Sequence, residues 1–352
     1  MRTGEAVVSV LRGDWLTTGP RVPAFELELA AYTGARHAVA FSSGTAALHG
    51  AAVAAGLATF ALGTETWGSI LCPSAFCGLT GIRPSYGVVS RAGGMVGAYT
   101  FDKVGPLARS ANDARTVLGA LAGPDPRDPS ATSEKVRLGR GEGRAPRTLR
   151  AALVPLDWSK FGEPEVKRAF EEAVRVLRDA GVMLEEVALP QVPASEVAGL
   201  LISVEAIAAF EPFLEDGRVR QLHDRMAAHQ REVADPITGA DVIKAIRVRE
   251  SIQRTMRDFL DRYDVIVSPN FMSVAPLVAQ DLNEALPYPD PLGGLAAACG
   301  LPGLALPIGP ATHGLPASLQ IVGAPYDEAT LLDLGDLYQS RTPHHRAHPA
   351  IA

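Results

Sequence analysis

The chain has 352 residues, of which 47% are hydrophobic and 6% are aromatic, and its formal net charge is −6. This length predicts one large domain or two moderate ones, with a core built mostly of Ala, Val and Leu. The negative charge argues against a nucleic-acid-binding protein. The sequence shows neither a secretory signal nor an apolar run long enough to span a membrane, so we expect a cytoplasmic protein without a membrane segment.

The first 49 residues carry two motifs, VLRGDWLTTGPRV at 10–22 and SSGTAALH at 42–49. Together they resemble the opening of the PLP-dependent sugar aminotransferases of the DegT/DnrJ/EryC1 type. In that family the Ser-Gly-Thr turn opens a helix whose N-terminal N–H groups hold the cofactor's phosphate. The resemblance ends before the family's Schiff-base lysine, so residues 1–49 are predicted to be an aminotransferase-like fragment.

An alanine-rich helix is predicted from Thr45 to Gly56. Ser43 and Thr45 are both suitable N-cap residues, because their side-chain oxygens accept an early backbone N–H. The structural interpretation of the preceding turn, Ser42-Ser43-Gly44, is therefore a capping turn without a catalytic role.

Residues 63–70 read GTETWGSI and place Ser69 at the end of a tight loop. Backbone N–H groups of Thr66, Trp67, Gly68 and Ser69 can converge on one point, as an anionic tetrahedral intermediate requires. Ser69 is therefore a candidate nucleophile, and it needs a neighbouring base to take its proton.

This loop, with several motifs that follow it in order, resembles the amidase signature family over about residues 50–349. The motifs are GLTGIRPSYG at 78–87, DKVGPLARS at 102–110, YDVIVSP at 263–269 and GLPASLQIVG at 314–323. The resemblance implies an α/β fold, a mixed sheet covered by helices, here lacking the family's N-terminal portion. It also implies hydrolysis of an amide, with Ser69 as nucleophile and the backbone of Thr66, Trp67 and Gly68 as the oxyanion hole.

The family passes the nucleophile's proton through a second serine to a lysine, and both lie N-terminal to the nucleophile. Counting back without a gap places the second-serine position at Thr45, with Ser42 or Ser43 as alternatives. The first lysine of the chain is Lys103, so the family's catalytic lysine is absent and Lys103 is expected to support the fold. Glu65 and Trp67 replace the Asp and Gly of the commonest family pattern, and we expect them to reshape the acyl pocket.

Beyond the loop, residues 124–146 are rich in Pro, Gly and charged residues and are predicted to form a flexible surface segment. A strand at 149–154, an amphipathic helix at 163–180 and a strand at 182–187 predict a βαβ unit. Residues 195–263 are expected to be mainly helical, with Val242, Ile246, Ile252 and Phe259 on the apolar side of a helix at 241–260. Short buried strands are predicted at 265–267 and 304–306.

The remaining candidate residues receive structural interpretations. The three cysteines, Cys72, Cys77 and Cys299, are expected to be buried thiols in a reducing compartment. His344, His345 and His348 are assigned to a mobile basic tail, and no metal or other cofactor is predicted.

Three functions follow from these patterns. The first is an amidase that acts on a small-molecule carboxamide and is impaired because its catalytic lysine is absent. The second is a catalytically inactive amidase-like scaffold or binding protein. The third, PLP-dependent transamination, is disfavoured by the missing lysine. Because the N-terminal fragment was not shaped for an amidase sheet, marginal stability or self-association is also expected.

Overall fold

The computed structural model has an α/β architecture and describes residues 46–134, 136–145, 148–218, 237–276 and 290–349. The helices are α3 (Ala46–Ala54), α4 (Leu71–Phe76), α5 (Ala111–Leu121), α6 (Trp158–Phe161), α7 (Pro164–Asp179), α8 (Ala194–Ala209), α9 (Glu211–Glu215), α11 (Gly239–Leu260), α13 (Gly293–Cys299) and α14 (Glu328–Arg341). The strands are β1 (Phe60–Glu65), β2 (Thr80–Arg83), β3 (Lys103–Ala108), β4 (Arg150–Leu153), β5 (Met183–Glu186), β6 (Val265–Pro269), β7 (Gly303–Pro310) and β8 (Pro316–Gly323). Two 3-10 turns, η4 (Thr312–Gly314) and η5 (His344–Arg346), complete the set.

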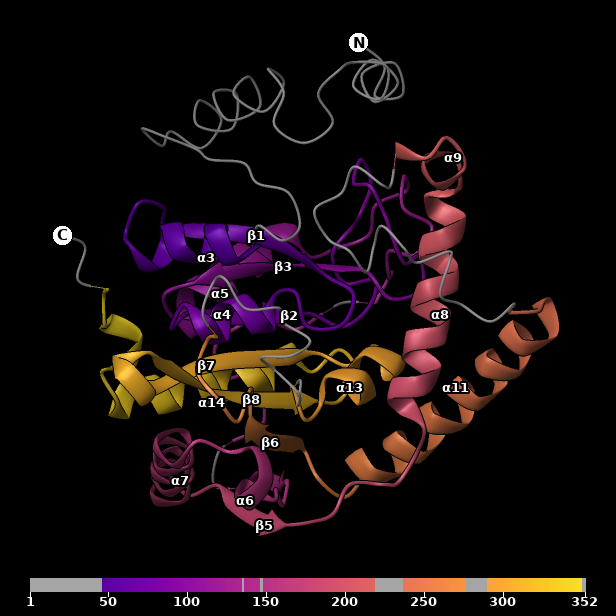
Figure 1. The fold of residues 1–352 in the computed structure, drawn as a ribbon. Helices are drawn as coiled ribbons and strands as arrows, with labels where there is room; N and C mark the ends of the chain where they lie inside the picture. Colours follow the sequence, from indigo (N-terminus) through magenta and orange to yellow (C-terminus); the bar gives the residue numbers. More distant parts are fainter. Residues whose placement is uncertain (1–45, 135, 146–147, 219–236, 277–289, 350–352) are drawn as a thin grey trace.

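One mixed sheet of eight strands joins the described parts of the chain, in the order β1-β3-β2-β7-β8-β6-β4-β5. The strands from β1 to β6 in this order pair antiparallel, whereas β4 pairs parallel with both β6 and β5. Figure 1 shows α3 and β1 at one end of the sheet and β5, α6 and α7 at the other. The predicted mixed sheet is confirmed, and so is the βαβ unit, which comprises β4, α7 and β5.

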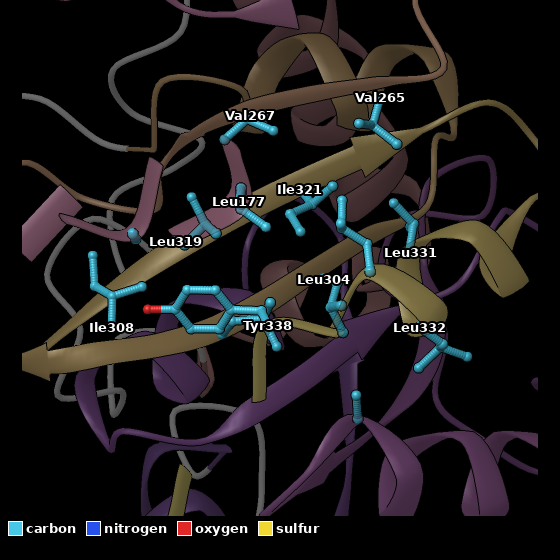
Figure 2. Close-up of a cluster of buried hydrophobic side chains, with 14 of the residues drawn as sticks. Leu177, Val265, Val267, Leu304, Ile308, Leu319, Ile321, Leu331, Leu332 and Tyr338 are labelled. Carbon is cyan, nitrogen blue, oxygen red and sulfur yellow. The ribbon is translucent and has the colours of Figure 1, made fainter. Parts of the chain in front are cut away.

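The main core lies between the sheet and helices α5, α7 and α14. The predicted apolar positions of α7 are buried there, because Val166, Phe170, Val174 and Leu177 recur at helical spacing. Figure 2 shows part of this core, in which Leu304, Leu319 and Ile321 from the sheet lie among side chains of α7 and α14.

The other face of the sheet is covered at one end by α3 and α4 and further along by α13 and the end of α11, and α8 packs on these last two helices. In α11, Ile252 and Phe259 are buried as predicted. The assignment of Ile246 to the apolar side was wrong, because its side chain is 49% exposed. Ala245, one position earlier, is buried instead, and Ile252, Met256 and Phe259 continue the same 3.6-residue stripe.

Residues 122–145, where described, contain neither a helix nor a strand of the sheet. Polar contacts tie them to the rest of the fold: Arg91 N donates to Asp128 (2.7 Å), and Gly143 N donates to Asp333 (3.0 Å). Asp333 in turn pairs with Arg115 at 2.7 Å. Val136 and Leu138 pack against the main core. In the described parts of the chain, no helix is long and apolar enough to cross a membrane.

Candidate active site

Ser69 lies in the turn between β1 and α4, and its side chain is exposed. The neighbouring residues Thr66, Trp67 and Gly68 are half-buried. A Cβ built on Gly68 would meet no atom of the described residues within 4 Å, so these residues leave the loop surface beside the serine open. An incoming carbonyl group can therefore approach Ser69 from this side.

Glu65, the last residue of β1, fixes the far end of this loop. One carboxylate oxygen accepts the N–H groups of Ile70 (2.7 Å) and Leu71 (3.0 Å) at the start of α4. The other pairs with Arg83 Nη1 at 2.6 Å, and both side chains are fully buried. Arg83 also donates to the carbonyl oxygens of Trp67 (3.3 Å) and Leu301 (3.0 Å). A buried carboxylate needs such partners, because an unpaired buried charge is costly.

Trp67 is held against the start of α13 by close approach. A Cβ built on Gly293 would lie 2.4 Å from Trp67 Nε1, and one built on Gly294 would lie 2.8 Å from Cζ2 of the same ring. Only glycine at these two positions leaves room for the indole. The proposed effect of Trp67 on an acyl pocket stays a prediction, since these close contacts of the indole are with α13.

Thr66 is tied to the start of β3. Its hydroxyl donates to Asp102 Oδ1 at 2.6 Å. The register of β1 and β3 places Glu65 opposite Lys103, which brings Asp102 next to Thr66. The loop is thus held at Thr66, at Trp67 and at its junction with α4.

No base contacts Ser69 in the described part of the chain, where its hydroxyl has no hydrogen-bond partner. Lys103, the first lysine after it, is only 2% exposed and donates to the carbonyl oxygen of Phe101. Burial, followed by the nearby charge of Arg83, lowers the pKa of this amine from its ordinary 10.5 to about 7. Thr45, Ser42 and Ser43, the candidates for the second-serine position, lie outside the described residues.

A second buried polar group, not singled out in the sequence, lies near the loop at Asp290. Its carboxylate accepts Leu292 N (2.9 Å) and Gln320 Nε2 (3.2 Å), and burial raises its pKa to about 7. Asp102 was noticed only as part of a motif. No local pattern could have shown the bonds of these carboxylates to Thr66 and Gln320, which lie 36 and 30 residues away from them.

The other residues considered in the sequence carry no site here. The three cysteines are half-buried, and burial raises the pKa of Cys72 to about 12, of Cys77 to about 11 and of Cys299 to about 12. These thiols therefore stay protonated and are poor nucleophiles. Over residues 46–349, leaving aside the undescribed segments, no group of three or more His, Cys, Asp or Glu could hold a metal ion.

Comparison with known proteins identifies two families in the chain. The Amidase family matches residues 40–332, and the DegT/DnrJ/EryC1/StrS aminotransferase family matches residues 2–66. The two matches overlap from residue 40 to residue 66.

Similar curated proteins include two bacterial proteins that are each named as the A subunit of glutamyl-tRNA(Gln) amidotransferase. The protein from Roseiflexus sp. (strain RS-1) is 36% identical over 330 residues, which cover 86% of this chain and 67% of the relative. The protein from Heliobacterium modesticaldum is 32% identical over 329 residues, with the same two shares.

Similar solved structures agree. The A subunit of glutamyl-tRNA(Gln) amidotransferase from Thermotoga maritima has a TM-score of 0.67 at 26% identity, covering 84% of this chain and 65% of its own. The peptide amidase from Stenotrophomonas maltophilia has a TM-score of 0.67 at 28% identity, covering 85% and 65%. The chain thus spans about two thirds of the length of these relatives. With a family match over most of its residues and the same fold, the chain belongs to the amidase signature family of hydrolases.

Proposed function

We propose that the chain is an amidase-type hydrolase of carboxamide C–N bonds, with Ser69 as nucleophile and with strongly impaired turnover. The observation that carries this proposal is the exposed Ser69 at the end of a loop held by Glu65, Arg83 and Asp102. Such a rigid loop suits the stabilisation of charge in a transition state, because its N–H groups need no reorganisation.

In the proposed reaction, Ser69 Oγ attacks the carbonyl carbon of the amide and the carbonyl oxygen becomes an oxyanion. The N–H groups of Thr66, Trp67 and Gly68 donate to that oxygen. The amine leaves, and water then hydrolyses the acyl ester on Ser69. The weak step is the first, because the chain has no lysine before Ser69 to take the hydroxyl proton.

Purified protein should therefore release little ammonia from simple aliphatic and aromatic amides. An oxyanion hole and substrate binding alone leave roughly 10³–10⁴-fold acceleration over water. We expect Ser69→Ala to keep only this part of the rate and to lose any turnover that passes through the serine, whereas Thr64→Ala, an exposed neighbour on β1, should keep both. Fast turnover that is lost in Ser69→Ala would contradict the impairment and require another base.

Covalent labelling distinguishes the impaired amidase from the alternative, an inactive amidase-like scaffold. A fluorophosphonate should add to Ser69 slowly but detectably by intact mass, and Ser69→Ala should not react. A folded wild-type protein that never reacts would favour the scaffold.

We also propose a junction of the two families near residue 49, inside the overlap of the two matches. The aminotransferase match ends at residue 66, so transamination has little support from the remaining chain. A PLP absorbance band after addition of the cofactor would instead support transamination.

A further inference from the structure

Asp102 connects the Ser69 loop to a second segment, Gly97–Phe101. One carboxylate oxygen accepts the Thr66 hydroxyl at 2.6 Å. The other accepts the N–H groups of Gly97 (2.8 Å) and Ala98 (3.0 Å). Hydrogen bonds to an ionised acceptor are stronger than neutral ones, so a single side chain fixes both segments together.

The second segment is itself fixed by two helices. Thr100 donates its N–H and its hydroxyl to Glu205 of α8, at 2.9 Å and 2.6 Å. Arg249 of α11 donates to the hydroxyl (2.8 Å) and carbonyl (3.0 Å) oxygens of Thr100. Its guanidinium also lies over the ring of Phe101, 4.1 Å from the centroid. The position of Asp102 therefore depends on the positions of α8 and α11.

The other contacts that fix the loop, those of Glu65 and Arg83, make no hydrogen bond to α8 or α11. Glu65 bonds to the start of α4 and to Arg83, and Arg83 bonds to the loop and to Leu301. Among the described residues, the contact between Thr66 and Asp102 is the polar link from the Ser69 loop toward α8 and α11.

We propose that Asp102 is a positioning residue for the oxyanion-binding loop, acting through the hydroxyl of Thr66. The effect of Asp102 on catalysis rests on the proposed function, in which Ser69 is the nucleophile. Asp102 need not touch the substrate. It sets the direction of the N–H groups of Trp67 and Gly68, and Glu205 and Arg249 fix the segment that supports it.

A pair of substitutions at Thr66 isolates the hydroxyl. Thr66→Val keeps the shape of the side chain and loses the donor, whereas Thr66→Ser keeps the donor. Asp102→Asn is the matching change on the acceptor, because an amide has one oxygen and cannot accept both the Thr66 hydroxyl and the N–H groups of Gly97 and Ala98. Asp113→Asn, at the exposed start of α5, serves as the control acid.

The first readout is amide hydrogen exchange in the full-length protein, which does not depend on activity. We expect exchange at Ile70 and Leu71, whose N–H groups bond to Glu65 at the end of the loop, to rise by about tenfold or more in Thr66→Val and Asp102→Asn, since a hydrogen bond that holds the loop is lost. Thr66→Ser and Asp113→Asn should exchange like the wild type. Unchanged exchange at these two residues in Thr66→Val, or an equal rise over the whole chain, would overturn the inference.

The second readout is the rate of fluorophosphonate addition to Ser69. We expect a fall of about tenfold in Thr66→Val and Asp102→Asn, with recovery in Thr66→Ser. Wild-type protein that is not labelled would refute the role of Ser69, while hydrogen exchange would still decide whether Asp102 positions the loop. Equal labelling of Thr66→Val and wild type would count against the inference.

Discussion

Lys103 shows how burial changes the chemistry of a single residue in this site. It faces Glu65 in the register of β1 and β3, and Arg83, Asp102 and Arg249 are the other charges that act on it. Burial nevertheless dominates, and the amine has a pKa of about 7. The sequence assigned Lys103 a structural role, and its place under the loop, with the amine on the Phe101 carbonyl, is consistent with that role.

The lowered pKa predicts a pH-dependent stability. Between pH 7 and 10.5 the unfolded chain binds a proton at Lys103 that the folded chain has lost, so the free energy of unfolding rises with pH. From about pH 7.5 to about 8.5 we expect Lys103 to contribute a slope that approaches roughly 1.4 kcal/mol per pH unit, read in urea titrations as the difference between the wild type and Lys103→Met.

The other buried groups have raised pKa values, so they lower the stability as the pH rises: Asp290 up to just above pH 7, and the cysteine thiols as the unfolded thiols ionise near pH 9. The difference between the wild type and Lys103→Met cancels both contributions. Lys244→Met, an exposed lysine of α11, should keep the wild-type slope. Equal slopes in wild type and Lys103→Met would contradict the assignment.

At the scale of elements, α5 and α14 pack closely on the sheet through a glycine. A Cβ on Gly335 of α14 would lie 2.9 Å from Ala111 Cβ of α5 and 2.9 Å from Leu304 Cδ2 of β7. A Cβ on Gly119, which is exposed on α5, would have no atom of the described chain within 4 Å. The same residue type therefore has opposite consequences in two neighbouring helices.

We expect Gly335→Ala to lower the free energy of unfolding by about 1–3 kcal/mol, because the added methyl group overpacks the contact. Gly119→Ala should raise it by about 0.5–1 kcal/mol, because alanine favours the helix. Urea denaturation of both variants provides the measurement. Changes of the same sign would show that the packing of α14 on α5 is looser than the structure gives.

The sequence predicted the elements well where local periodicity decides them. The stripe of Val166, Phe170, Val174 and Leu177 defines α7 without tertiary information. In α11 the same reasoning misplaced Ile246, because the direction of the buried face depends on where α8 and α13 lie. Periodicity therefore predicts that a helix has an apolar face, whereas tertiary packing decides which residues of that face are buried.

At the scale of the whole molecule, the two edges of the sheet differ. β5 exposes Glu185 and Glu186 on one edge, and such charges discourage pairing with another chain. β1 lies at the other edge and exposes Phe60 and Leu62, while its one charge, Glu65, is buried. No described strand pairs with the outer side of β1.

This asymmetry gives the expected self-association a location. We predict that the apparent mass of the wild type rises with concentration in analytical ultracentrifugation, and that Leu62→Lys reduces this rise. Met183→Lys places the same charge on β5 and should have no effect, since Met183 is exposed on the protected edge. A wild type that stays monomeric, or an equal effect of both variants, would argue against association through β1.

The sequence by itself determined the family resemblance, the candidate nucleophile and the absence of a lysine before Ser69, because these depend on residue order alone. It also predicted the mixed sheet and the βαβ unit. Only the tertiary structure decided which contacts hold the Ser69 loop. They are the ion pair of Glu65 with Arg83, the packing of Trp67 against Gly293 and Gly294, and the hydrogen bond from Thr66 to Asp102. These contacts join residues far apart in the chain, and they exist because strand register and helix packing bring the two partners together.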